Sequence, residues 1–575
     1  SPHAHAIIKR IDTSKAEALP GVRAVLTFQD FPQPAEPVME TIRGPMPAAW
    51  DTERIMARRK VLFRGHPVAA VAATDMHIAE DALDLIEVEY EVLPAVVTLD
   101  DALAEGAPIL HDDEYVGLVP DLFSSQGGKP TNIARTLELR VGDIDAGFAE
   151  AEVVMERQYE TAMVHQGYIE PHNGTAMWNA DGRVTIWTST QGAFGIRSNV
   201  ARVLRIPLGD LRVIPTEIGG GFGAKNVVYL EPIAALLSKK TGHPVKLTMN
   251  RTEVLEATGP TSGTRSWVRL GAKRDGTLVA ADIRLEYEAG AYPGSPMPGG
   301  ARCALGPYAV PHQRIVGYDI VLNRPKVAAY RAPGAPASEF AVESLLDELA
   351  ERLEMDPMAL RLKNAASLGT PRSDGATHGS IGAREVMEAV VNHPHYRSEL
   401  MGQDVGRGVA MGFWQNGGGE SSAYANVHAD GRVTLVTGSV DIGGLRASLA
   451  MQFAEAMGIP YEDIASLVGD TDTIGYTGNT GGSRSAFATG WAVYQAAMDV
   501  RQQMEARVAK IWECDASAVS YDPEGDGSGA VLRGPEGKTM TYREACRRLP
   551  GTGGMIQGQA DIVSTNVGKV GACFG

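Results

Sequence analysis

The chain has 575 residues, with 53 Lys or Arg against 70 Asp or Glu, so its formal net charge at pH 7 is -17. Nucleic-acid binding requires a basic face that neutralises phosphates, and this charge disfavours that class of protein. Apolar residues make up 44% of the chain and charged residues 21%, which is typical of globular proteins, and no run approaches the roughly 20 apolar residues that span a bilayer.

Cysteine usage and the first residues bound the class of protein further. The 4 cysteines have neither paired nor zinc-finger spacing, which disfavours a disulfide framework and an iron–sulfur cluster held by this chain. Ser1–His5 lacks an initiator Met and the shape of a signal peptide. We therefore expect this chain to be a piece of something longer.

The first stretch predicts an α+β unit that ends near residue 115. Val22–Phe28 alternates like a half-buried strand, whereas Val68–Ala73 is continuously apolar like a buried one. Met76–Ile86 has the apolar spacing of a helix packed on a sheet. A Gly-, Ser- and Pro-rich passage at Ser124–Pro130 then predicts a linker, and a second domain is expected from residue 131.

The remaining chain alternates strands and helices, which predicts mixed α+β domains with a further boundary at residues 390–405. The clearest helix is Glu339–Asn364, with Ser338 as its expected cap and an interruption at Asp356-Pro357. The other expected elements are strands at Arg183–Thr190, Leu211–Ile214 and Arg432–Val436, and helices at Ile196–Leu204 and Leu449–Met457, the last ended by Gly458.

Three glycine-rich turns could carry chemistry. Gly219–Gly223 follows a predicted strand, and consecutive glycines let backbone amides approach an anion or cofactor closely. Asp441–Gly444 and Thr480–Ala486 each lead into a predicted helix, whose N-terminal amides favour anionic groups. By itself, the first turn could equally be a tight turn that leaves a strand, and the other two would more often be helix caps.

A few polar side chains stand close to these turns. Gln191, at a strand end, offers an amide donor to an oxo or carbonyl oxygen, and Arg331 offers a guanidinium fork to developing negative charge. Taken singly, the Gln is more often a surface residue and the Arg a structural or solvated one. Glu217 could be a base, but a single carboxylate on a strand usually faces solvent or pairs with a cation. His165 and His172 lack a further ligand at metal-site spacing, which favours a structural role.

Taken in order, these segments resemble the molybdenum-binding large subunit of the xanthine dehydrogenase, aldehyde oxidase and carbon monoxide dehydrogenase family. The resemblance covers nearly the whole chain. It implies an α+β multidomain fold truncated at both ends, with an a/b-hammerhead-like domain at 1–115 and molybdopterin-binding domains at 131–390 and 405–575. The motifs that carry it are Ser1–Ala6, Ala18–Val22, Gly167–Pro171, Thr190-Gln191, Gly219–Gly223, Ala329–Gly334 and Gly481–Ser485.

The resemblance also implies the roles of particular residues. Gln191 would donate to a molybdenum oxo group and Arg331 would lie over the substrate, as the catalytic residues, while Asn226 and Ala332 would line the substrate pocket. The pterin dithiolene, not protein side chains, would hold the metal. The cofactor-binding residues would be Gly220, Gly221, Phe222, Gly223, Gly443, Gly444, Gly482, Ser483, Ser485 and Ala486.

The implied reaction is hydroxylation of an aldehyde or aromatic N-heterocycle by water, assisted by a base. The implied cofactor is molybdopterin in its cytosine dinucleotide form. Electrons would pass to iron–sulfur clusters on a partner subunit, because this chain has no cluster-binding cysteines. They would pass on to FAD where a flavin subunit is present. The resemblance therefore implies a heteromeric cytoplasmic enzyme, with a dimer of heteromers as one assembly.

The chain departs from the family pattern at several positions. The family's general-base Glu would lie beyond Gly575. Gly443–Arg446 stands where the family commonly has Gly-Gln-Gly-Thr. Asn226 replaces the Glu of purine-oxidising relatives and Ala332 replaces the copper-binding Cys of carbon monoxide dehydrogenases, which disfavours xanthine and carbon monoxide as substrates. Two alternatives stay open: a reductive member acting on a hydroxyaryl-CoA thioester, and a non-catalytic homologue that binds a cofactor or partner.

Overall fold

The computed structural model describes residues 1–575 except 42–43, 112–116, 120–121, 124–130, 416, 526, 528, 565–571 and 575. It divides into two compact units, each made of segments that are distant in sequence. Unit 1 comprises Ser1–Gly167, Met249–Asn416 and Gly568–Gly575, and unit 2 comprises Tyr168–Thr248 and Gly417–Val567. The predicted linker Ser124–Pro130 lies outside the described residues. The domain boundaries expected near residues 115–131 and 390–405 stay predictions.

The N-terminal part of unit 1 confirms the first elements expected from the sequence. β2 (Val22–Thr27) pairs antiparallel with β6 (Ala69–Ala73), and α3 (Met76–Leu83) packs beside them. The side chain of Asp75 accepts the amide of Ile78, which fixes the start of α3. Neighbouring elements are β1 (Ala6–Asp12), β5 (Lys60–Val61), β7 (Glu87–Val92), α1 (Ser14–Ala18), β3 (Val38–Met39), β4 (Met46–Pro47), α2 (Trp50–Glu53) and α4 (Leu99–Leu103).

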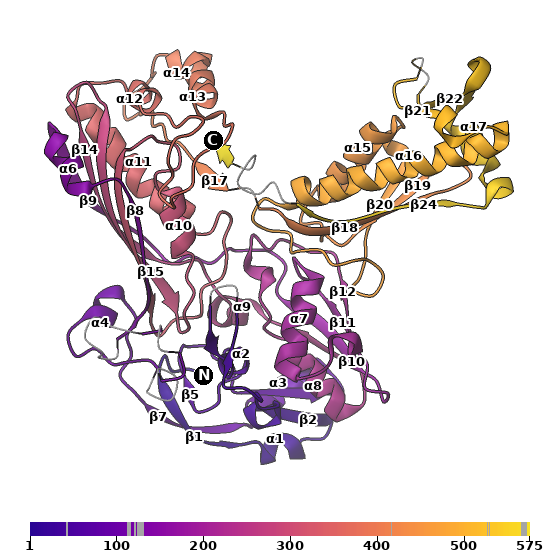
Figure 1. Ribbon diagram of the computed structural model, residues 1–575. Coiled ribbons are helices and arrows are strands. Elements are labelled where there is room, and N and C mark those ends of the chain that lie inside the picture. The colour runs from indigo at the N-terminus through magenta and orange to yellow at the C-terminus, as the bar shows by residue number, and fades with distance from the viewer. Residues whose placement is uncertain are drawn as a thin grey trace. The chain divides into compact units, whose positions relative to one another are not determined.

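The rest of unit 1 is built on a 5-stranded sheet of order β8-β16-β15-β14-β9. Helices α10 (Met297–Cys303) and α11 (Ala335–Arg352) pack on this sheet (Figure 1) and enclose an apolar core that includes Leu285 and Leu345. The strands are β8 (Ile133–Val141), β9 (Val153–Thr161), β14 (Thr264–Ala272), β15 (Leu278–Gly290) and β16 (His312–Val321). Further elements are α6 (Ile144–Glu150), α9 (Arg251–Ala257), α12 (Pro357–Lys363), α13 (Ala383–Asn392), α14 (Pro394–Arg397), β17 (Phe413–Gln415) and β25 (Ala572–Phe574).

The long helix begins earlier than the sequence predicts. Gly334 is the residue before α11, so the expectation that Ser338 caps this helix is wrong. The Ser338 hydroxyl lies inside the first turn and donates to the carbonyl oxygen of Gly300, 2.9 Å away. Pro336 near the start favours this earlier beginning, because its fixed φ suits a first helical turn. The expected interruption at Asp356-Pro357 is confirmed, since α12 starts there under a cap by Asp356.

A partly buried carboxyl group on α11, that of Glu339, gives the stability of unit 1 a pH dependence. The pKa of Glu339 is raised to about 7, because burial and, to a smaller extent, the neighbouring Glu343 outweigh the lowering effect of a hydrogen bond from the Phe413 amide (3.0 Å). Because the pKa is higher in the folded chain than in the unfolded one, stability falls as pH rises from about 4.5 to 7 and then levels off.

We therefore expect Glu339→Gln to raise the free energy of unfolding at pH 8 by up to about 3 kcal/mol and to change it little at pH 5. The Gln side chain keeps an oxygen that can accept the Phe413 amide, but it has no carboxyl group to ionise. Urea unfolding midpoints at both pH values measure this difference. Glu351→Gln, at an exposed position of the same helix, is the matched control. Equal effects of the two substitutions at pH 8 would contradict the prediction.

Unit 2 contains the same arrangement of strands and helices twice. One sheet has the order β12-β11-β10-β13 and the other β20-β19-β18-β24. In each sheet the first two strands along the chain are antiparallel, and the second and third are parallel with a helix between them. The first half consists of β10 (Asn173–Trp178), β11 (Val184–Thr188), α7 (Ala193–Leu204), β12 (Leu211–Pro215), α8 (Glu231–Thr241) and β13 (Val245–Thr248). The second half consists of β18 (Gly419–Val427), β19 (Val433–Thr437), α15 (Leu445–Met457), β20 (Ile464–Val468), α16 (Gly490–Trp512) and β24 (Ile556–Ser564).

The second half of unit 2 encloses an extensive apolar core. Helix α16 crosses the sheet of β18, β19, β20 and β24 (Figure 1), and buries side chains such as Val493, Val500 and Met504 against Phe453 of α15. Gly458 ends α15 in the left-handed region (φ 65°), as its place after the apolar run predicts. The small elements that follow are β21 (Ser520–Asp522), β22 (Val531–Arg533), β23 (Thr539–Thr541) and α17 (Tyr542–Arg548).

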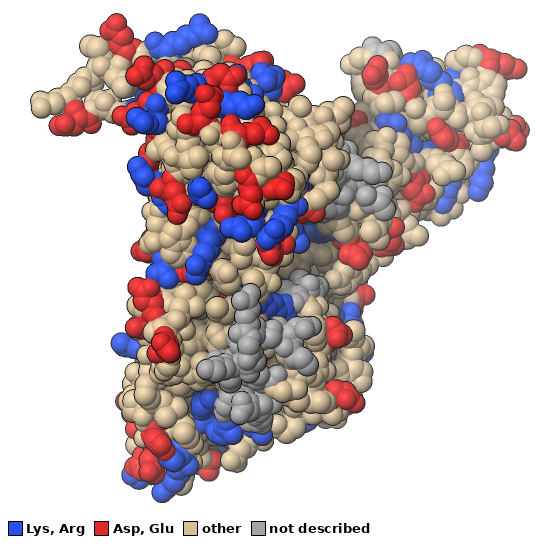
Figure 2. Space-filling view, turned by 60° about the vertical axis from the view of Figure 1, so that its left-hand side comes forward, with Lys and Arg blue, Asp and Glu red and all other residues tan. Residues whose placement is uncertain are grey.

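The surface carries both signs of charge. On the face drawn in Figure 2, acidic and basic side chains are interspersed among uncharged residues. Among the described residues, no helix combines the length and the hydropathy needed to cross a bilayer.

Candidate functional site

Loops that follow the carboxyl ends of parallel strands in unit 2 carry most of the site residues expected from the sequence. In open α/β sheets, ligands bind outside these strand ends. Because the two halves share one topology, the loops after β11 and β12 correspond to those after β19 and β20. The loops hold Gln191 after β11; Gly220, Gly221, Phe222 and Gly223 after β12; Gly443 and Gly444 after β19; and Gly482 and Ser483 after β20. Asn226 ends a short 3-10 turn that follows the glycine loop, and Ser485 and Ala486 begin a π-helical turn that leads into α16.

Gln191 joins three of these loops. Its Oε1 accepts the amides of Gly223 (2.9 Å) and Lys225 (3.2 Å), and its Nε2 donates to the carbonyl oxygen of Thr480 (2.9 Å). Gln191 is 2% exposed, so these bonds form out of water, where polar groups need partners most. A side-chain amide nitrogen carries two hydrogens, so one N–H of Gln191 can still serve an acceptor other than Thr480.

The glycine loop fits closely around Gln191. A Cβ on Gly221 would lie 2.5 Å from Gln191 Oε1, so only glycine permits this approach. The next residue, Phe222, has a φ of 53°, which bulky residues rarely adopt, and its side chain is 43% exposed. A left-handed phenylalanine is costly and persists only where the surrounding structure fixes it, as functional sites often do.

A buried ion pair supports the same loop. The ammonium group of Lys225, whose side chain has no exposed surface, lies 2.6 Å from Glu170 Oε2 and 3.0 Å from the Ser189 hydroxyl. The same carboxylate oxygen accepts the Gly219 amide at 2.6 Å. The Lys225 ammonium also lies 5.1 Å from the centre of the Tyr168 ring. Glu170 therefore holds the first residue of the glycine loop.

The charge state of Glu170 follows from these contacts. Burial disfavours the ionised carboxyl, but hydrogen bonds from Lys225, Ser189, the Gly219 amide and Asn173 outweigh it and lower the pKa to about 2. Lys225 was not among the site residues expected from the sequence. The available signal was a lysine two residues after the glycine loop and two residues before the apolar Val227-Val228, where a charge needs a partner.

The histidines on either side of Glu170 have structural contacts. The Nε2 of His165 lies 2.9 Å from the Thr258 hydroxyl, and the His172 ring meets the rings of Tyr168 and Tyr229 edge-on. No group of three potential metal-ligating side chains occurs among the described residues.

The turn before α15 is capped by its own carboxylate. Asp441 accepts the amides of Gly443 (2.8 Å), Leu445 (2.9 Å) and Arg446 (3.2 Å). Burial opposes ionisation of Asp441, but these backbone bonds and the Arg446 guanidinium prevail and lower its pKa. Gly444 lies between Gly443 and Leu445 and has a φ of 84°. Its amide is not one of the three that donate to Asp441.

The turn before α16 contains an arginine that holds backbone carbonyl groups. Arg484 is 8% exposed, and its guanidinium donates to the carbonyl oxygens of Gly418 (2.7 Å) and Gly478 (2.9 Å). Ser483, just before it, has a φ of 56°. Two buried oxygen atoms near this turn, Ser485 Oγ and Asn226 Oδ1, have no hydrogen-bond partner among the described residues. Such atoms are expected to meet a bound polar group or water.

The other expected residues, Arg331 and Ala332, belong to unit 1. Ala332 has a φ of 59°, and the following Gly334 fits against α10, where a Cβ would lie 2.4 Å from the Pro296 carbonyl oxygen. The Tyr287 hydroxyl donates to the Gly334 carbonyl oxygen at 2.8 Å. Arg331 itself is exposed and makes no ion pair with a described carboxylate. The turn is thus fixed, and its guanidinium is presented to solvent.

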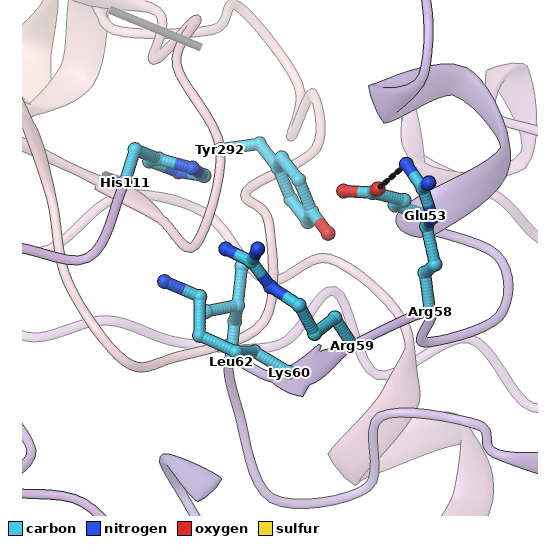
Figure 3. Close-up of a pocket in the computed structure, with 7 residues that line it drawn as sticks. All are labelled: Glu53, Arg58, Arg59, Lys60, Leu62, His111 and Tyr292. Atoms are coloured by element: carbon cyan, nitrogen blue, oxygen red, sulfur yellow. Dashed lines mark ion pairs between the residues drawn. The ribbon is translucent and has the colours of Figure 1, made fainter. Parts of the chain in front are cut away.

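Unit 1 also contains a small cavity of ≈ 90 Å³ that involves none of the expected site residues (Figure 3). Arg58 pairs with Glu53 at 3.7 Å on its wall, and the ring of Tyr292 lies 5.6 Å from that of His111. The Lys60 ammonium donates to the Leu110 carbonyl oxygen at 2.9 Å. These contacts bind the wall residues to one another.

Three family models match the chain. Residues 1–94 match the a/b hammerhead domain of aldehyde oxidase and xanthine dehydrogenase. Residues 125–365 and 393–562 each match a molybdopterin cofactor-binding domain.

Curated proteins and solved structures agree with these models. The chain is 30% identical to the probable hypoxanthine oxidase XdhD of Escherichia coli K12, covering 98% of this chain and 63% of that protein. It is 30% identical to the carbon monoxide dehydrogenase large chain of Afipia carboxidovorans, covering 91% and 68%. It is 31% identical to the nicotinate dehydrogenase large molybdopterin subunit of Eubacterium barkeri, covering 67% and 85%.

Among solved structures, the Cu,Mo-CO dehydrogenase has a TM-score of 0.82 at 28% identity, covering 98% of this chain and 75% of that one. Quinoline 2-oxidoreductase from Pseudomonas putida 86 has a TM-score of 0.83 at 25% identity, covering 98% and 74%. The chain thus has the α+β multidomain architecture expected from its sequence, over part of the length of these proteins.

Proposed function

Because this chain belongs to the xanthine dehydrogenase and aldehyde oxidase family of molybdenum hydroxylase large subunits, we propose that it is the catalytic subunit of an enzyme that hydroxylates an aldehyde or aromatic N-heterocycle with water. The chain spans 63% of the length of relatives such as XdhD, so the activity of the whole protein is part of the proposal. Relatives named for nicotinate, nicotine and quinoline favour the heterocycle.

The observation that carries this proposal is the junction at Gln191. One buried side chain binds the glycine loop after β12 and, through Thr480, the loop after β20. The cofactor would be held between these loops by amides of Gly220–Gly223 and Gly482–Ala486, with the Gly443-Gly444 turn beside them. The side-chain oxygens of Ser485 and Asn226, which have no hydrogen-bond partner in the described part of the chain, fit a polar ligand such as a molybdopterin.

When bound, the cofactor would supply the redox chemistry and accept the electron pair removed from the substrate. The chain's own groups would orient the reactants. The second N–H of Gln191 would donate to an oxygen of the metal centre, and the exposed guanidinium of Arg331 would bind a substrate oxygen that gains negative charge. The general-base Glu is proposed to lie beyond Gly575.

Asn226 and Ala332 would shape the substrate pocket. An amide at Asn226 can hydrogen-bond but cannot carry the negative charge of a glutamate, and the methyl group of Ala332 cannot bind copper as a cysteine does. These side chains support a substrate other than xanthine or carbon monoxide.

The proposal includes partners and a location. Electrons would leave through an iron–sulfur subunit, with a flavin subunit where one is present, since Cys303, Cys514 and Cys546 are dispersed single cysteines. The cofactor would be the cytosine dinucleotide form. A cytoplasmic location fits free thiols, which oxidising compartments would tend to pair.

The deciding experiment is the molybdenum content of the full-length gene product, purified with its partners from a host that makes the pterin cofactor and measured by elemental mass spectrometry. The proposal expects about one metal per chain, and then dye reduction with aldehydes or N-heterocycles. Folded protein without molybdenum would contradict it and favour a non-catalytic binding homologue. Reduction of a hydroxyaryl-CoA thioester would favour the reductive alternative.

Arg331 provides a more local prediction. Arg331→Ala should lower turnover by about 10- to 100-fold with little loss of molybdenum, since it removes a stabilising charge and leaves the cofactor loops of unit 2 intact. Steady-state kinetics and metal analysis of the same preparation measure both quantities. Equal loss of turnover and molybdenum would show that Arg331 is structural.

A further inference from the structure

The two halves of unit 2 contact each other in a reciprocal way. In the first half, Gln191 stands between β11 and α7 and reaches Thr480, in the loop after β20 of the second half. In the second half, Arg446 stands at the start of α15, which follows β19, and reaches Glu217, in the loop after β12 of the first half. Arg446 thus makes a contact between the halves that runs in the opposite direction to that of Gln191, although Gln191 precedes the N-cap of its helix and Arg446 lies in the first turn of α15.

The contacts of Arg446 are directional. Its Nη1 donates to Glu217 Oε1 at 3.0 Å and its Nη2 to Glu217 Oε2 at 2.9 Å, the parallel two-bond geometry that guanidinium and carboxylate groups favour. Its Nε donates to Asp441 Oδ2 at 3.0 Å. One arginine thus connects the cap of α15 to the segment that leads into the glycine loop at Gly219.

The charge of this cluster determines what it can do. One guanidinium faces two carboxylates, and Asp441 already accepts the amides of Gly443, Leu445 and Arg446. A phosphate at this turn would meet a net negative charge, and the amides of Gly443, Leu445 and Arg446 already donate to Asp441. The positive end of the α15 dipole would not by itself offset these two effects. The cluster is therefore suited to join two loops and unsuited to receive an anion.

We propose that Arg446 is a positioning residue of the cofactor cradle: through Asp441 and Glu217 it ties the turn before α15 to the glycine loop, without touching the cofactor's phosphate. This inference rests on the proposed function for the cradle itself. It assigns a role to the segment Gly443–Arg446, which departs from the family pattern. It also accounts for the ion pair of Glu217, since a single carboxylate usually faces solvent or pairs with a cation.

Hydrogen–deuterium exchange of the full-length protein tests the proposal. Arg446→Ala and Glu217→Ala should each raise exchange at Gly219–Gly223 and at the Gly443 and Leu445 amides by about 2- to 5-fold, as expected for an exposed ion pair. The double variant should show no faster exchange than either single variant, because both substitutions remove the same interaction. Molybdenum content should fall by a similar factor in all three variants.

Arg533→Ala is the matched control, because Arg533 forms an ion pair with Asp522 in unit 2 (2.8 Å) and its side chain is exposed to a similar degree as that of Arg446, 45% against 37%. It should change neither exchange at the two loops nor molybdenum content. Exchange rates that rise additively in the double variant would overturn the coupling between the two loops. The same rise in exchange and loss of molybdenum in Arg533→Ala would also overturn it. Raised exchange with wild-type molybdenum content would overturn the role toward the cofactor. Hydrogen–deuterium exchange is also measured on cofactor-free protein. Wild-type protein without molybdenum would contradict the proposed function. The exchange rates of the variants would still decide whether Arg446 couples the two loops.

Discussion

Replacing Gly221 with Val is expected to reduce the molybdenum content by about tenfold or more, because the branched side chain collides with the Gln191 amide and forces the loops apart. A single Cβ at this position already lies 2.5 Å from Gln191 Oε1 and 3.0 Å from its Cδ. Gln191 cannot move away without losing its bonds to Gly223, Lys225 and Thr480. Elemental mass spectrometry of purified full-length variants measures the effect.

Gly209→Val is the matched control. Gly209 lies in the short connection between α7 and β12, and a Cβ there would meet no atom within 4 Å. This variant should retain the molybdenum content of the wild type. If Gly221→Val also retained it, the assignment of the glycine loop to the cofactor would be wrong.

Replacing Lys225 with Met is expected to destabilise the protein by about 3–5 kcal/mol near neutral pH, because the Glu170 carboxylate would lose its buried partner. The side chain of Lys225 has no exposed surface, and its ammonium group holds both Glu170 and Ser189. Urea or thermal unfolding of the full-length protein measures the loss. Lys239→Met, which removes an exposed lysine that lies over the Trp178 ring, should cost far less.

The pH dependence gives a second readout for Lys225. The pKa of Glu170 is lowered to about 2, so its contribution to stability is present above its unfolded pKa of about 4.3 and is lost as pH falls toward 2. Lys225→Met removes the main partner that favours ionisation, so the difference from the wild type should narrow between pH 5 and pH 3. A difference that stays constant over this range would show that Lys225 acts through packing alone.

Much of the local structure could be predicted from the sequence. Apolar periodicity placed β2, β11, β12 and β19 within a few residues of their ends, since these strands alternate or run apolar as their burial requires. Gly458 and Pro357 marked helix boundaries correctly, because their backbone preferences act locally. The start of α11 was misplaced, since Pro336 and the fit of Gly334 against α10 decide it.

The candidate site divides in the same way. The order of short motifs predicted the family and the glycine turns, because a close backbone approach excludes every side chain and so leaves a mark in the sequence. The partners of Glu170 and Glu217 were not predictable. Lys225 lies 55 residues from Glu170 and Arg446 lies 229 residues from Glu217. Only folding brings these residues together.

The sequence by itself determined which turns need glycine, where single strands and helices lie, and which family the chain belongs to, because these depend on local sterics and on motif order. The tertiary structure alone decided that unit 2 repeats one strand order in two halves, and that Gln191 and Arg446 each reach from one half to the other. A repeated topology requires only a pattern of strand pairing and burial, and many different sequences satisfy that pattern. The two halves therefore need not share a repeated sequence motif.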